Sequence, residues 1–158
     1  MEKIGVGLIG TGYMGKCHAL AWNAVSGVFG GELKPELVML AEVNEELAAA
    51  RAKDFGFAKS TSNWRDMLAD PEIHIISITT PNEFHPEMAI AALEAGKHVY
   101  CEKPMAPSFE DAQKMLEASR KSGKKNVSGI QLHPKPHDAP HPRPVECRRN
   151  WRSATGPS

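Results

Sequence analysis

Residues 3–15 read KIGVGLIGTGYMG, and this stretch decides the fold. The apolar run from residue 3 to residue 9 predicts a buried strand. Directly after it, residues 10–15 read GTGYMG, with the glycine spacing G-x-G-x-x-G, and Tyr13 begins a segment with helical apolar periodicity. A glycine loop between a strand and a helix is typical of a dinucleotide-binding turn, so the sequence predicts one here.

Each glycine of this loop has a separate physical role in such a turn. Gly10 allows the tight bend, Gly12 lets the backbone approach a pyrophosphate, and Gly15 lets the helix pack closely on the strand. The helix N-terminus then favours the negative charge of the phosphates. The same loop contributes three further predicted cofactor contacts: Thr11, Tyr13 and Met14.

An acidic residue is expected at the end of the second strand, which the sequence predicts over residues 36–43. Glu42 lies there, and its carboxylate would accept hydrogen bonds from a ribose diol and repel a 2′-phosphate. NAD is therefore favoured over NADP as cofactor. Glu42 lies further from the glycines than the usual ~20 residues, and we expect the loop around Gly30 and Gly31 to absorb the difference.

Strands and helices alternate along the rest of the chain up to about residue 123. Further strands are predicted at 57–59, 73–80 and 98–101. Helices are predicted at 13–26, 45–54, 63–70, 83–95 and 108–122, with Ser62 and Ser108 as candidate N-caps. This alternation predicts an α/β fold, a Rossmann-type doubly wound parallel sheet covered on both faces.

Composition narrows the class of protein. The chain has 158 residues, enough for one domain, and its formal net charge of +0 gives no field toward nucleic acid. No run approaches the ~18 apolar residues that would cross a bilayer, and the N-terminus lacks a secretory-signal pattern. Three cysteines, Cys17, Cys101 and Cys147, share no metal or redox spacing. The sequence predicts a cytoplasmic protein with no nucleic-acid or membrane partner.

Two further strings carry a family resemblance. TTPNEFH at 79–85 follows the strongest predicted strand, and GKHVYCEKP at 96–104 spans the next one. With GTGYMG, they make residues 3–125 resemble the N-terminal half of the glucose–fructose oxidoreductase / inositol dehydrogenase (Gfo/Idh/MocA) family. The resemblance implies an NAD-dependent oxidoreductase that transfers hydride between nicotinamide and a sugar or cyclitol hydroxyl.

The resemblance also implies roles for individual residues. The TPN loop would line the nicotinamide-ribose side of the cofactor, and Glu102 would also face the cofactor. Lys103 would be the catalytic residue, because a lysine whose pKa is lowered by partial burial can take or stabilise the proton of a substrate hydroxyl. The positions implied on the loop after the fourth strand are Thr79, Thr80, Pro81, Asn82 and His85.

Structural alternatives remain open for several of these side chains. Lys103 could be a solvated lysine at a strand end, and His85 could cap or pack at the start of its helix. The remaining histidines of the fold are expected to be structural: His18, His74 and His98.

The family resemblance stops before the end of the chain. The family places a second catalytic pair, much of the substrate pocket and its homo-oligomer interface in a C-terminal α/β domain. We expect residues 1–126 to form the NAD(P)-binding domain and residues 127–158 to form a non-family, disordered tail. The sixth strand could form only within residues 127–132. On this interpretation the chain alone is inactive, and its oligomer interface is lost.

The tail invites a specific hypothesis. Read from the second base of each codon, residues 126–152 can encode TLVGFNYTQNPMMRHIRDLLSAGEIG, which is the expected family continuation. The codons of Lys124, Lys125 and Asn126 form a run of adenines where one extra base would shift the frame. We therefore expect out-of-frame translation from Asn126 onward.

A metal or nucleic-acid role for the tail is disfavoured. Six of the chain's 12 prolines lie beyond residue 133, and they interrupt the helix that a four-residue histidine spacing would need. One tryptophan is too little for base stacking. The histidines at that spacing are His133, His137 and His141.

Two other functions stay open at this stage. The first is a non-catalytic nucleotide-binding fragment. The second is a different nucleotide user of the same fold, such as a methyltransferase, which is not expected to carry the CEKP string at 101–104.

Overall fold

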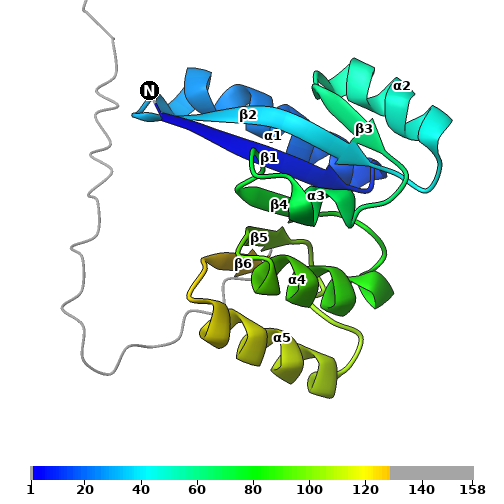
Figure 1. Ribbon diagram of the computed structural model, residues 1–158, viewed down its shortest axis with the longest axis vertical. Coiled ribbons are helices and arrows are strands. Elements are labelled where there is room, and N and C mark those ends of the chain that lie inside the picture. The colour runs from blue at the N-terminus through cyan, green and yellow to red at the C-terminus, as the bar shows by residue number, and fades with distance from the viewer. Residues whose placement is uncertain (1, 129–158) are drawn as a thin grey trace, which may run out of the picture.

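The computed structural model describes residues 2–128, which form a six-stranded sheet flanked by helices (Figure 1). The strand order is β3-β2-β1-β4-β5-β6, and all five neighbouring pairs are parallel. This arrangement confirms the predicted Rossmann-type α/β fold. The strands are β1 Glu2–Ile9, β2 Leu33–Ala41, β3 Lys59–Thr61, β4 Ile75–Ile78, β5 His98–Cys101 and β6 Asn126–Ser128.

Helices cover both faces of the sheet, as Figure 1 shows. The helical elements are α1 Tyr13–Phe29, α2 Glu45–Phe55, α3 Asp66–Ala69, the 3₁₀ turn η1 Asn82–Phe84, α4 His85–Glu94 and α5 Phe109–Ser122. Because side chains alternate along a strand, neighbours in β1 enter different cores. Leu8 packs with alanines of α1 and α2, whereas Ile9 packs in the core that includes residues of α3, α4 and α5. The sheet is therefore covered on both sides, as the alternating sequence predicts.

The order of strands creates a switch point. β1 comes first in the chain but lies between β2 and β4. The chain leaves β1 toward one edge of the sheet and leaves β4 toward the other, so their loops diverge. In open parallel sheets, ligands bind outside the carboxyl ends of the strands at such a point.

The connection between α1 and β2 is shorter than the sequence suggests. Residues 27–35 look like a loop, but α1 runs to Phe29 and β2 begins at Leu33. Gly30 and Gly31 make the turn with φ of 61° and 105°. Pro35 is tolerated in β2 because β3 pairs with that strand only from Met39 onward, so the proline lies on a free edge. The extra spacing before Glu42 therefore lies in a longer helix and strand, not in a loop.

Smaller shifts occur around β3. This strand was expected at 57–59 but covers Lys59–Thr61, because Phe57 is buried against α2 instead. Ser62 does not cap the next helix. The Thr61 hydroxyl lies 2.5 Å from an Asp66 carboxylate oxygen, and α3 is confined to Asp66–Ala69.

Strand β6 pairs with β5 over Asn126–Ser128, at the start of the stretch expected to form the sixth strand. The expectations for residues 129–158, including the frame shift and the histidine spacing, lie outside the described residues. Within residues 2–128, no helix is long and apolar enough to cross a membrane. In the same range, no three His, Cys, Asp or Glu side chains gather as metal ligands would.

Candidate functional site

The glycine loop after β1 is closely packed against its surroundings. The Gly10 amide donates to the Ala41 carbonyl at 3.0 Å, and Gly10 has a positive φ of 87°. A Cβ at Gly15 would lie 2.2 Å from the Gly10 carbonyl oxygen, far inside contact distance. Only glycine at position 15 lets α1 sit this close to the loop, which is the packing role expected from the sequence.

The start of α1 differs from the starts of α2 and α5. Asn44 and Ser108 cap those two helices by accepting hydrogen bonds from backbone amides of their first turns. Gly12 is the N-cap of α1 and makes no such side-chain bond. A Cβ at Gly12 would meet nothing within 4 Å. Amide donors at a helix N-terminus bordering open space are what a phosphate group needs, so this loop fits a dinucleotide.

Glu42 lies directly after β2, beside the glycine loop. Its Oε1 accepts from both the amide and the hydroxyl of Thr11, at 2.6 and 2.5 Å, and its Oε2 accepts from the Val43 amide at 3.0 Å. A carboxylate oxygen has two lone pairs, so Oε1 is fully used while Oε2 can accept one more bond. The carboxylate is held in place and still offers an acceptor to a ribose hydroxyl.

The end of β4 is joined to the glycine loop through Thr79. Its hydroxyl lies 3.0 Å from the Ile9 carbonyl oxygen and 2.8 Å from that of Gly10. Thr79 is buried, so this side chain supports the loop from beneath. A direct contact between Thr79 and a cofactor stays a prediction.

The TPN loop that follows contains both surface and buried residues. Pro81 is exposed, and Asn82 begins the 3₁₀ turn η1. His85 is only 1% exposed, and its Nε2 and Nδ1 lie 2.8 Å from the Thr80 carbonyl oxygen and 3.0 Å from that of Pro104. This geometry does not test the prediction that His85 lies near the cofactor. It shows that both ring nitrogens of His85 already lie against backbone carbonyl oxygens.

Glu102 follows β5 and is buried against α1. His18 Nε2 lies 2.8 Å from its Oε1, and the Lys103 amide donates to its Oε2 at 3.1 Å. Burial raises the pKa of the Glu102 carboxyl, but the hydrogen bonds from His18 and Lys103 outweigh burial and hold the pKa below its usual value. Because the carboxylate is ionised and can only accept, His18 donates to it from Nε2, and the other ring nitrogen, Nδ1, lies 2.7 Å from the Ser77 hydroxyl oxygen.

The two sequence neighbours of Glu102 differ in exposure: Lys103 is exposed and Cys101 is buried. The Lys103 side chain is exposed, so residues 2–128 do not supply the partial burial expected for a catalytic lysine. Cys101 is 3% exposed, and burial raises the pKa of its thiol to about 12. This cysteine is therefore a core residue and not a nucleophile.

His18 is structural, as expected, but the sequence interpretation did not anticipate that its ring would hold Glu102. Its ring connects β4 and Glu102, at the centre of the carboxyl edge. One signal was available: His18 lies three residues after Gly15, and residues so spaced share a helix face. Because Gly15 must face the sheet, His18 had to face it as well. His74 and His98 are structural as expected, since each Nδ1 accepts from a backbone amide.

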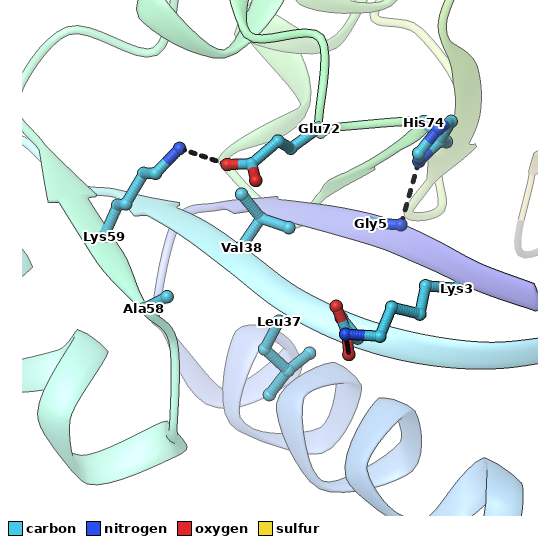
Figure 2. Close-up of a pocket in the computed structure, with 9 residues that line it drawn as sticks. Lys3, Gly5, Leu37, Val38, Ala58, Lys59, Glu72 and His74 are labelled. Atoms are coloured by element: carbon cyan, nitrogen blue, oxygen red, sulfur yellow. Dashed lines mark hydrogen bonds and ion pairs between the residues drawn. The ribbon is translucent and has the colours of Figure 1, made fainter.

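A hollow of about 390 Å³ lies at the opposite, amino-terminal edge (Figure 2). Lys3, Lys59 and Glu72 line it, and their charges are paired among neighbouring side chains. Figure 2 shows the His74 ring directed at the Gly5 amide, which donates to it at 2.9 Å. This hollow lies at the wrong end of a parallel sheet for a cofactor, so the candidate site is the carboxyl edge.

A doubly wound parallel sheet, a glycine loop at an uncapped helix start and an acidic residue after β2 define a dinucleotide-binding Rossmann domain. Residues 4–129 match the family model of Gfo/Idh/MocA oxidoreductases, described as an oxidoreductase family with an NAD-binding Rossmann fold. The chain therefore belongs to the Gfo/Idh/MocA family, and NAD is its cofactor.

Curated relatives include two characterised sugar and cyclitol dehydrogenases. Levoglucosan dehydrogenase of Pseudarthrobacter phenanthrenivorans is 50% identical over 119 residues, covering 75% of this chain and 30% of the relative. Inositol 2-dehydrogenase of Salmonella typhimurium is 36% identical over 124 residues, covering 77% of this chain and 34% of the relative. The chain thus spans about a third of the length of these relatives.

Solved structures give the same result. Levoglucosan dehydrogenase in complex with NADH and L-sorbose superposes with a TM-score of 0.79 at 46% identity, covering 81% of this chain and 35% of that one. Its complex with NADH and levoglucosan gives a TM-score of 0.78 at 45% identity, covering 80% of this chain and 35% of that one. The similarity therefore extends to three-dimensional structure.

Proposed function

We propose that this chain is the NAD-binding part of a dehydrogenase that oxidises a hydroxyl group of a sugar or cyclitol. One observation carries the proposal: the carboxyl edge brings the glycine loop, Glu42 and the Glu102–Lys103 pair together around the switch point of the sheet. The relatives named for levoglucosan and inositol support the substrate class.

The adenosine half of the cofactor is assigned to the β1 and β2 side of this edge. The uncapped start of α1 at Gly12 would bind the pyrophosphate. Oε2 of Glu42 would accept a hydrogen bond from the ribose diol, while its charge would repel a 2′-phosphate. NAD should therefore bind more tightly than NADP.

The nicotinamide half is assigned to the β4 and β5 side. Thr80, Pro81 and Asn82 would line the nicotinamide ribose, and bound nicotinamide supplies the hydride acceptor. Lys103 would hold or take the proton of the substrate hydroxyl as hydride leaves. Glu102 would position Lys103 through its bond to the Lys103 amide and place a buried negative charge close to the reacting groups.

The same residues are not expected to turn substrate over by themselves. Lys103 is exposed in residues 2–128, and positioning of a substrate is worth roughly 7 to 11 kcal/mol of the barrier. We propose that the second catalytic pair and most of the substrate pocket come from a partner domain, as the family resemblance implies. The alternative function, a nucleotide-binding fragment without catalysis, is favoured for this chain alone by the same exposure.

Calorimetric titration of the 158-residue chain with NADH and NADPH tests the proposal. NADH should bind and NADPH should bind more weakly, with no reduction of NAD by levoglucosan, inositols or aldoses. Lack of NADH binding would contradict the cofactor assignment, and appreciable turnover would contradict the need for a partner domain. Fusing residues 1–126 to the C-terminal domain of a levoglucosan dehydrogenase should create activity that Lys103→Met abolishes.

We also propose that residues from Asn126 onward are read out of frame. The support is that the codons of Lys124, Lys125 and Asn126 (AAR, AAR and AAY) permit a run of adenines, and that the shifted frame permits a family-like string. Sequencing the gene tests this directly. The downstream DNA should continue the family sequence in the shifted frame, and a downstream sequence without that continuation would refute the hypothesis.

A further inference from the structure

His85 is buried between two loops that belong to different strands. It is the first residue of α4 and is 1% exposed. Its Nε2 lies 2.8 Å from the carbonyl oxygen of Thr80, in the loop after β4. Its Nδ1 lies 3.0 Å from the carbonyl oxygen of Pro104, in the loop after β5. The ring is therefore placed directly between the TPN loop and the EKP loop.

Both partners of the ring are acceptors, so the ring must donate. A carbonyl oxygen has lone pairs and no proton, and an imidazole nitrogen bonds to it only when it carries hydrogen. A neutral ring makes one of these bonds, and a ring protonated on both nitrogens makes both. Removing the donor leaves a buried carbonyl group without its partner, which is costly.

The loops that the ring connects carry different parts of the proposed machinery. Thr80 is followed by Pro81 and Asn82, which are assigned to the nicotinamide ribose. Pro104 follows Lys103, which is assigned to the substrate hydroxyl. Strand pairing alone does not fix the distance between these segments, because β4 and β5 end at Ile78 and Cys101, before either loop begins.

We propose that His85 is a positioning residue: its ring lies between the carbonyl oxygens of Thr80 and Pro104, donates to at least one of them, and so sets the spacing between the TPN and EKP loops and the place of Lys103 relative to the nicotinamide. Because the side chain is 1% exposed and both ring nitrogens lie against backbone carbonyl oxygens, it would act through these loops and not by touching cofactor or substrate. This inference rests on the proposed function, in which the nicotinamide half binds at these two loops.

The ligand test uses two probes on the 158-residue chain and two variants. ADP carries the part of the cofactor assigned to Gly12 and Glu42, whereas NADH also carries the nicotinamide half. His85→Leu fills similar space without a donor, and His85→Gln keeps amide donors. We expect His85→Leu to weaken NADH about tenfold while ADP affinity stays within about twofold, and His85→Gln to recover most of the loss.

Several outcomes would overturn the inference. His85→Leu could bind NADH as tightly as the unmodified chain, or NADH and ADP could weaken together, which is what a general packing defect produces. A Gln variant no better than Leu would also count against a donor role. Calorimetry is used for these measurements because it gives the binding stoichiometry together with each affinity.

A second measurement does not depend on cofactor binding. Backbone hydrogen exchange of residues 80–84 and 102–106 should accelerate in both loops of His85→Leu and in neither loop of His85→Gln. Acceleration in one loop only, or in none, refutes the link between them. If the unmodified chain fails to bind NADH, the proposed function fails, while hydrogen exchange still decides whether His85 joins the loops.

Discussion

The two edges of the sheet use polar side chains in opposite ways. At the amino edge, Lys3 pairs with Glu36 at 2.9 Å, and Lys59 pairs with Glu72 at 2.6 Å, in contact with solvent. At the carboxyl edge, polar groups are buried and held by more than one partner, as with Glu102, which lies 2.8 Å from His18 and also accepts from the Lys103 amide. The two lysine–glutamate pairs neutralise their charges at the surface of the amino edge. One ammonium of that edge, that of Lys97, is buried and donates to the Asp70 and Ile73 carbonyl oxygens. The carboxyl edge instead buries an ionised carboxylate, that of Glu102.

This difference explains why only one edge is suited to bind a ligand. Exposed ion pairs add little stability and exchange readily with water. Buried hydrogen bonds fix loops, because an unmade bond is costly there. The carboxyl edge is rigid beneath its surface, yet it leaves the amides at the start of α1 facing open space. Rigid support with free donors is the arrangement that recognises phosphate.

The largest effect at the carboxyl edge is expected for Gly15→Ala. The added methyl would lie 2.2 Å from the Gly10 carbonyl oxygen, so α1 must move away from the loop. We expect about 2 kcal/mol or more of lost stability and NADH binding below detection. Gly12→Ala is the matched control, since its methyl meets nothing within 4 Å. In denaturant unfolding, Gly12→Ala should be as stable as the unmodified chain, although its methyl obstructs the pyrophosphate. An equal loss of stability in the Gly12 and Gly15 variants would contradict this account.

The next largest effect is expected for Glu102→Gln. Losing the charged acceptor of His18 should cost about 1–3 kcal/mol at neutral pH. Because the folded pKa of this carboxyl is depressed, its contribution is present above the ordinary carboxyl pKa and is lost as pH falls through the folded value. The stability gap between the two proteins should therefore shrink in acid. A gap that grows in acid would contradict the assignment, and Glu36→Gln at the amino edge is the control.

Cofactor preference should change in Glu42→Ala. We expect NADH to weaken about tenfold, because the ribose acceptor is lost. NADPH should bind no worse than before, since the repulsion of its 2′-phosphate disappears. Titration with both cofactors measures this, with Glu36→Ala, inside the preceding strand β2, as the control. Parallel losses of NADH and NADPH would show that Glu42 acts only by holding Thr11.

The smallest effect is expected at the amino edge. In Lys59→Met, an exposed ion pair with Glu72 and a pair with the largely buried Asp70 carboxylate are lost, and the thermal midpoint should fall only slightly. Added salt should reduce the difference, because salt already screens the exposed pair with Glu72. NADH affinity should be unchanged. A clear loss of NADH affinity would mean that the amino edge influences cofactor binding at the carboxyl edge, and it would contradict the separation of the two edges.

Local patterns were enough to predict the fold and much of the site. The glycine loop, the strand at 98–101 and the Ser108 cap were all readable from neighbouring residues, and the Ser108 hydroxyl does accept from the Asp111 amide. Contacts between distant residues were not readable. His18 and Glu102 are 84 positions apart, and Thr11 and Glu42 are 31 apart. Such pairs depend on how helices settle on the sheet, which periodicity does not encode.

The central place of β1 has a consequence for the chain as it is made. β1 leaves the ribosome before the other strands of this sheet, yet its second neighbour arrives only with β4, and the Thr79 hydroxyl bonds a carbonyl 70 positions earlier. Until then, one edge of a buried, apolar strand stays open to other chains. Translation that pauses before residue 78 would prolong this aggregation-prone stage. Chaperone demand should therefore be highest before the switch point exists, when no cofactor can yet bind.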